Sequence, residues 1–135
     1  MVMNVSEPPS KRAVWTGRAM SALVILFLAM DAVMKLVDPT FVADANKQLG
    51  FPTNLDRPLG LLLLAITVLY ALPATTFTGL VLMTGYLGGA VASHLRIGSP
   101  LFSHVLFGVY IEALAWGGVW LRDCRLRRLF PLKQC

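Results

Sequence analysis

The chain has 135 residues, the length of a single domain, and a formal net charge of +5. Hydrophobic residues make up 56% of it, charged residues only 14%, and the mean hydropathy is +0.67. A soluble domain carries about 25% charged residues, and so short a chain cannot account for the difference with a larger core. The composition therefore excludes an ordinary soluble domain and indicates an integral protein of the lipid bilayer.

The basic residues gather at the two ends of the chain. Basic residues beside apolar segments are typical of the cytoplasmic surface of a membrane, so the charge does not indicate a nucleic-acid partner. We expect a flexible cytoplasmic tail over residues 1–14 and a basic cytoplasmic tail over residues 122–135.

The first predicted span covers residues 15–35, about the 20 residues that the hydrocarbon core requires. Asp31 and Lys35 lie four residues apart near its far end, so they share a helix face and can pair. The pair is either an interfacial ion pair with Lys35 reaching outward or part of a functional site.

Asp38-Pro39 is expected to stop this helix. Residues 40–49 follow, which are too few and too polar to span a membrane. Their apolar side chains fall on roughly one helical face, so we predict a short amphipathic helix on the outer surface. These side chains are Phe41, Val42, Ala45 and Leu49.

No Asp, Glu, Lys or Arg occurs in residues 58–95. One helix of that length would exceed the bilayer, and Pro73 divides the segment. We therefore predict a helical hairpin with spans over residues 58–72 and 75–94, and we place Tyr70 at the membrane interface.

A fourth span is predicted over residues 101–121, after a turn. Gly85 and Gly89 form a small-xxx-small pair in the third span, which favours close packing between helices. The fold class is thus an all-α membrane protein, with a four-transmembrane-helix bundle over residues 15–121. The positive-inside rule places both termini in the cytoplasm, in a bacterial-type cytoplasmic (inner) membrane.

Polar groups converge on the outer half of this bundle. Glu112 lies about 12 Å deeper than His104 along one helix, and a charge at that depth is costly unless it is paired or neutralised. Its candidate partners are His104, Tyr86, Lys35 and Arg96; alternatively, Glu112 makes a buried hydrogen bond that fixes helix register. The candidates for ligand binding or proton handling are Glu112, His104, His94, Arg96, Tyr86, Asp31 and Lys35.

Metal binding and covalent catalysis have little support in the sequence. Two histidines and two carboxylates could bind a transition metal, but no dense i,i+4 pair of ligands occurs, so no metal site is expected. No phosphate loop, zinc pattern or nucleophile elbow is present.

Several motifs over about residues 20–132 resemble those of the DoxX-like family of small membrane proteins. They are Asp31-Ala-Val-Met-Lys35-Leu with Pro39, Leu49-Gly-Phe-Pro52, Leu69-Tyr70 before Pro73, Thr84-Gly-Tyr-Leu-Gly-Gly-Ala-Val-Ala-Ser-His94 with Arg96, Pro100-Leu-Phe-Ser-His104, and Trp116-Gly-Gly-Val-Trp-Leu-Arg122-Asp. The resemblance implies a four-helix membrane bundle. The family is named after a subunit of a thiosulfate:quinone oxidoreductase.

Three functions are consistent with these observations. The first is binding of a small amphipathic molecule, a quinone or a lipid, in an outward-facing polar cavity, without catalysis by the chain alone and without a covalently bound cofactor. The second is a membrane subunit of a quinone-linked oxidoreductase, in which Glu112 and the histidines handle protons. The third is a small proton-coupled transporter. A homo-oligomer or a membrane protein partner could supply missing elements.

Overall fold

The computed structural model of the protein describes residues 8–37, 40–52 and 54–130. Helices joined by short turns make up these ranges, and no strand occurs within them, which confirms the predicted all-α class. The elements are α1 (Lys11–Val37), α2 (Thr40–Gln48), α3 (Asp56–Ala71), α4 (Thr76–Arg96), the π-helical turn η1 (Leu101–Val105), α5 (Phe107–Arg122) and α6 (Cys124–Leu129).

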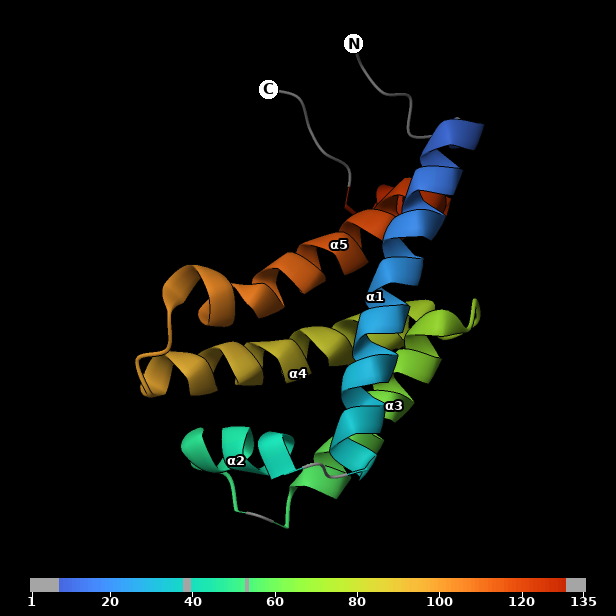
Figure 1. Cartoon of the computed structure of the whole chain (residues 1–135). Helices are drawn as coiled ribbons and strands as arrows, with labels where there is room; N and C mark the ends of the chain where they lie inside the picture. Colours follow the sequence, from blue (N-terminus) through green and yellow to red (C-terminus); the bar gives the residue numbers. More distant parts are fainter. Residues whose placement is uncertain (1–7, 38–39, 53, 131–135) are drawn as a thin grey trace.

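Four helices close into a ring. Helix α1 packs against α3 and α5, and α4 packs against the same two helices. Figure 1 shows α4 and α5 running antiparallel and crossing α1. Buried aliphatic side chains from all four helices fill the centre, and these include Val24, Leu28, Leu63, Leu80, Met83 and Val119.

Tyr70 lies inside this ring, so its predicted place at the membrane interface is wrong. The side chain is 0% exposed. Its hydroxyl donates to the carbonyl of Ala115 at 3.1 Å and accepts from Ser21 Oγ at 2.9 Å. A buried tyrosine is stable where its hydroxyl finds partners, and here the partners join α3 to α1 and α5.

Three segments are long and apolar enough to cross a membrane by length and composition: Lys11–Val37, Thr76–Arg96 and Leu101–Arg122, which combines η1 with α5. Helix α3 has 16 residues. At 1.5 Å per residue it is about 24 Å long, shorter than the roughly 30 Å hydrocarbon core. The structure thus supports three of the four predicted spans and leaves the fourth as a proposal.

The ends of the predicted segments also differ in detail. Helix α1 begins at Lys11, so residues 11–14 of the predicted tail are helical, and α6 occupies part of the predicted basic tail. The predicted stop at Asp38-Pro39 lies outside the described residues, as do residues 1–7 and 131–135.

Glycine makes close helix contacts, but at other positions than predicted. A Cβ built on Gly17 would lie 2.5 Å from the carbonyl of Gly118, and one on Gly79 would lie 2.6 Å from a backbone atom of α3. By contrast, a Cβ on Gly85 or Gly89 would meet no atom within 4 Å. The prediction that Gly85 and Gly89 bring helices together is therefore wrong within this chain, because they face open space.

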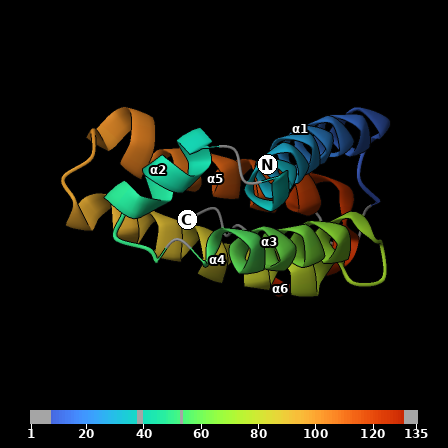
Figure 2. The ribbon, with the colours of Figure 1, turned by 60° about the horizontal axis from the view of Figure 1, so that its bottom comes forward.

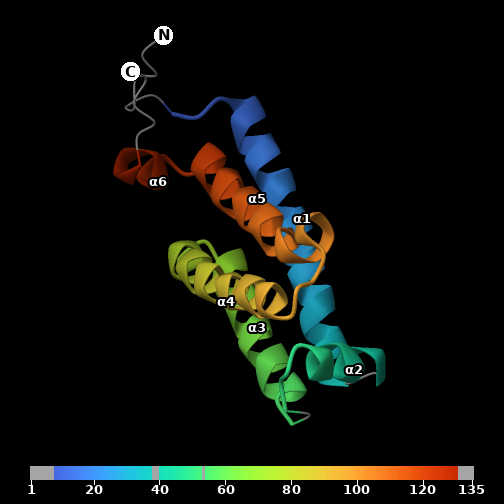
Figure 3. The same cartoon turned by 90° about the vertical axis from the view of Figure 1, so that its left-hand side faces the viewer.

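The short helix α2 lies at the end of the ring where α1 ends and α3 begins (Figures 1 and 3). Figure 2, in which this end comes forward, shows α2 in front of the larger helices. Its Asn46 is buried, whereas Phe41 is 59% exposed. A helix is therefore present where the short amphipathic helix was predicted, and the side chain facing the bundle is polar.

Helix α6 follows the last turn of α5 at the opposite end, the end of the molecule at which α1 begins (Figure 3). Arg127 caps α5, since its guanidinium donates to the carbonyls of Trp120 and Leu121 at 2.8 and 2.7 Å. The basic residues of the two chain ends are thus brought to one end of the molecule.

Candidate functional site

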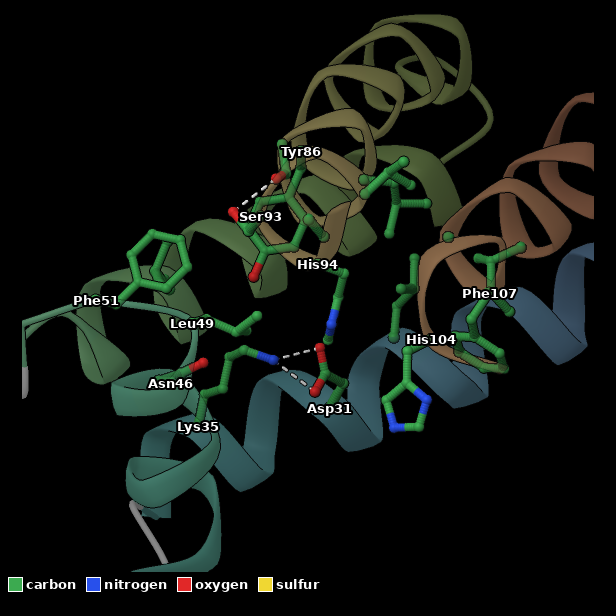
Figure 4. A pocket seen from close by; sticks show the side chains of 18 of the residues that line it. Asp31, Lys35, Asn46, Leu49, Phe51, Tyr86, Ser93, His94, His104 and Phe107 are labelled. Atoms are coloured by element: carbon green, nitrogen blue, oxygen red, sulfur yellow. Dashed lines mark hydrogen bonds and ion pairs between the residues drawn. The ribbon is translucent and has the colours of Figure 1, made fainter. Parts of the chain in front are cut away.

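A cavity of about 570 Å³ lies between α1, α2, α4, η1 and the first turns of α5. Much of its lining is apolar, with aromatic side chains Phe27, Phe51 and Phe107. Figure 4 shows polar side chains facing one another across it from α1, α4 and η1. The cavity brings together five of the seven predicted site residues: Asp31, Lys35, Tyr86, His94 and His104.

Helix α1 contributes the ion pair of the cavity. Lys35 Nζ lies 2.6 Å from both carboxylate oxygens of Asp31, which confirms the predicted i,i+4 pair. The Lys35 side chain is 14% exposed and that of Asp31 is 36% exposed. Lysine is therefore the more buried partner, and the pair forms part of the cavity wall. It offers a ligand both donors and acceptors while its own charges cancel.

Helix α4 contributes Tyr86 and the space around it. Gly85 and Gly89 line the cavity on either side of this tyrosine, with no atom within 4 Å of their Cβ positions. Tyr86 lies eight residues before His94, about 12 Å along the helix. The two glycines thus leave room for a ligand along the tyrosine ring, between its hydroxyl and the polar end of the cavity.

The two histidines lie edge to face, with ring centroids 5.8 Å apart. Each is oriented by a serine near it in sequence: His94 Nδ1 is 3.1 Å from Ser99 Oγ, and His104 Nδ1 is 2.7 Å from Ser103 Oγ. Among the described residues, no group of three or more His, Cys, Asp or Glu side chains could hold a metal ion. The absence of a metal site stays a prediction.

Glu112 does not line this cavity, so its predicted place there is wrong. His104 belongs to the π-helical turn η1, which ends at Val105, whereas Glu112 belongs to α5, so the two residues do not lie on one continuous α-helix as the prediction assumed. Gly108, midway between them, lines both the cavity and a second hollow on the other side of the α4–α5 contact. Glu112 lines only the second hollow.

The partners of Glu112 also differ from those predicted. Its Oε1 accepts hydrogen bonds from Thr84 Oγ1 and from Trp116 Nε1, the latter at 2.7 Å. Trp116 lies four residues after Glu112, one helical turn, and Thr84 faces it from α4. Within the described ranges, Oε2 is buried and has no partner. His104, Tyr86 and the two cationic candidates are not bonded to it.

A family model described as the DoxX-like family matches residues 19–118. The chain belongs to the DoxX-like family. The match confirms the resemblance that the sequence motifs indicated. Family membership and the three long apolar helices together indicate a multi-pass membrane protein. No similar curated protein and no similar solved structure was found.

Every residue that lines the cavity falls inside the matched DoxX-like region. Arg96 also falls within this region but lies outside the cavity, so its predicted place there is wrong. Its guanidinium donates to the carbonyl of Leu49, just after α2. Gly50 follows with φ of +81°, and a Cβ there would lie 2.5 Å from Arg96 Nη2. Arg96 therefore joins the end of α4 to the end of α2, and the positive φ of Gly50 favours glycine at this turn.

A second polar contact of this DoxX-like chain holds α2 against α3. Asn46 Nδ2 donates to Asp56 Oδ1, and Asp56 is 1% exposed. Asn46 also lines the cavity. Together with Arg96, this contact places α2 along one side of the cavity as part of its wall.

Four polar residues that line these two hollows were not predicted from the sequence: Asn46, Ser93, Thr84 and Trp116. The spacing of Glu112 and Trp116 is a signal that could have found one of them, because residues four apart share a helix face. Asn46 and Thr84 carry no such signal, since their partners Asp56 and Glu112 lie on other helices.

Proposed function

We propose that this DoxX-like protein binds a small amphipathic molecule, a quinone or a lipid, in the cavity between α1, α2, α4 and α5. The proposal rests on the lining of this cavity, which is mostly aromatic and aliphatic and has a few polar groups at one end. Binding sites for small molecules are built in this way, with volumes of about 300–1,000 Å³. The cavity falls in that range.

The polar head of the ligand lies against the Asp31–Lys35 pair and the two histidines. The ammonium donates to a carbonyl or phosphate oxygen, and the carboxylate accepts from a hydroxyl. The apolar part lies against Phe27 and Phe107, whose rings pack edge to face with centroids 4.9 Å apart, in the space that Gly85 leaves open. A molecule that is polar at one end and apolar along its length fits this arrangement better than a wholly polar solute.

The proposed setting is the bacterial-type inner membrane, with α3 as the fourth, short span of a four-helix bundle. Support for α3 comes from its place in the ring, where it packs against α1 and α4. Both chain ends are cytoplasmic in this proposal, because exposed Lys11, Arg12, Arg125 and Arg128 lie at one end. The cavity, α2 and the turn before η1 then lie toward the outer side.

This orientation predicts that a cysteine placed at Ser99 reacts with an impermeant thiol reagent added outside intact cells. The native Cys124, the first residue of α6, stays unlabelled until the membrane is permeabilised. Labelling of Cys124 alone from outside would reverse the proposed orientation.

Mass spectrometry of compounds that co-purify from native membranes tests the ligand proposal. We expect a quinone or a lipid to remain bound to the wild-type protein after mild detergent extraction. Gly85→Leu places a side chain in the cavity, where a Cβ meets nothing within 4 Å, so the variant folds but loses the compound.

Gly88→Leu is the matched control. Gly88 lies one turn away on the same helix, is equally open and does not line the cavity. It is expected to retain the compound as wild type does. If neither wild type nor Gly88→Leu carries a bound species above the level of bulk membrane lipid, the cavity is not a ligand site.

A further inference from the structure

A second hollow, of about 370 Å³, lies on the other side of the α4–α5 contact. Leu87, Val91 and Gly108 belong to the linings of both hollows and form the wall between them. We call the second hollow the Glu112 groove. Most of its lining is apolar, and its polar groups are Thr84, Glu112 and the indole N–H of Trp116.

The carboxylate in this groove is incompletely satisfied. Oε1 accepts from two neutral donors, the hydroxyl of Thr84 and the indole of Trp116. Oε2 is buried and has no donor among the described residues. The ion pair that the described residues form joins Asp31 to Lys35, in the other hollow. Glu112 therefore lacks one hydrogen-bond donor and one positive charge, a costly state in apolar surroundings.

The groove has open space along α4. Gly88 lines it together with Glu112, and a Cβ on Gly88 would meet no atom within 4 Å. The surrounding side chains Val109 and Ala113 are apolar and exposed on the outer face of α5. A molecule dissolved in the bilayer can reach this groove without crossing the ring.

We propose that the Glu112 groove is a second ligand site, which takes an apolar molecule carrying one protonated amine. An ammonium supplies both of the things that Glu112 lacks, an N–H donor to Oε2 and a positive charge. A hydroxyl would supply only the donor, and a quaternary ammonium only the charge. This site is separate from the cavity of the proposed function, and the proposal does not depend on a ligand in that cavity.

Labelling by dicyclohexylcarbodiimide, an apolar reagent for carboxyl groups within membranes, tests the proposal on the full-length protein in liposomes. Without a ligand, Glu112 is expected to react, and mass spectrometry locates the adduct on its peptide. Dodecylamine, the probe ligand, is expected to cover Glu112. At about ten times its Kd, it is expected to slow the labelling about tenfold.

Dodecyltrimethylammonium is the control amphiphile, because it has the same chain and charge but no N–H. It is expected to leave the labelling rate unchanged. Equal protection by the two amphiphiles would overturn the proposal, since a donor to Oε2 would then play no part. A Glu112 that stays unlabelled without any amphiphile would overturn it too, because apolar molecules then do not enter the groove.

Two glycine variants separate the groove from the cavity. Gly88→Leu fills the groove and is expected to slow labelling of Glu112 even without amphiphile. Gly85→Leu fills the cavity on the other side and leaves both labelling and dodecylamine protection at the wild-type level. The opposite pattern, with Gly85→Leu blocking and Gly88→Leu neutral, would place the reactive carboxyl outside the groove. Melting curves of both variants confirm that they fold.

Discussion

Gly79→Ala is expected to lower the free energy of unfolding by at least about 2 kcal/mol. A Cβ at this position would lie 2.6 Å from Tyr70 Cα and 2.7 Å from the carbonyl carbon of Leu69. Both neighbours are backbone atoms, so no side chain can rotate to make room, and α3 and α4 must move apart. Thermal melting of the detergent-solubilised protein, followed by size-exclusion chromatography, measures the loss.

Gly88→Ala is the matched control for this prediction. It adds the same methyl group to the same helix, where nothing lies within 4 Å, and alanine favours the helix more than glycine does. It is expected to melt at or above the wild-type temperature. A Gly79→Ala variant as stable as Gly88→Ala would mean that α3 and α4 are not in the close contact described.

Tyr70→Ala is expected to cost about 3–5 kcal/mol, the usual loss for a large buried aromatic side chain. The side chain is 0% exposed, and its hydroxyl joins Ser21 of α1 to the Ala115 carbonyl of α5. Tyr70→Phe keeps the ring and is expected to cost about 1–2 kcal/mol, because two buried groups lose their hydrogen bonds. The same melting measurement applies.

Tyr110→Ala controls for the loss of a tyrosine as such, since Tyr110 is 46% exposed on α5. We expect it to lower the melting temperature far less than Tyr70→Ala does. Equal effects of the two alanine variants would contradict a core centred on Tyr70.

Composition and chain breakers were enough to predict the all-α class and most helix boundaries. A charge-free stretch divided at Pro73 allows only a helical hairpin, and the structure has α3 end at Ala71 and α4 begin at Thr76. The pair Asp31–Lys35 was also predictable, because i,i+4 spacing is a local rule.

Contacts between helices were not predictable from the same information. The sequence does not show how each helix is rotated about its axis, so Gly85 could not be distinguished from Gly79, though one faces open space and the other a backbone. Glu112 illustrates the same limit. The sequence predicted one helix through His104 and Glu112, whereas the structure has the π-helical turn η1 before α5, and the Glu112 carboxyl lies outside the cavity that His104 lines.

The central claim is that an amphipathic molecule occupies the cavity lined by Tyr86, His94 and the Asp31–Lys35 pair. Photolabelling the full-length protein in liposomes, with a diazirine-bearing quinone and in parallel a diazirine-bearing phospholipid, tests it most directly. We expect that one of the two probes attaches within residues 85–94, is competed by its unlabelled form, and fails to attach there in Gly85→Leu. Attachment spread over lipid-facing residues such as Leu23 and Leu26, unchanged in Gly85→Leu, would contradict it.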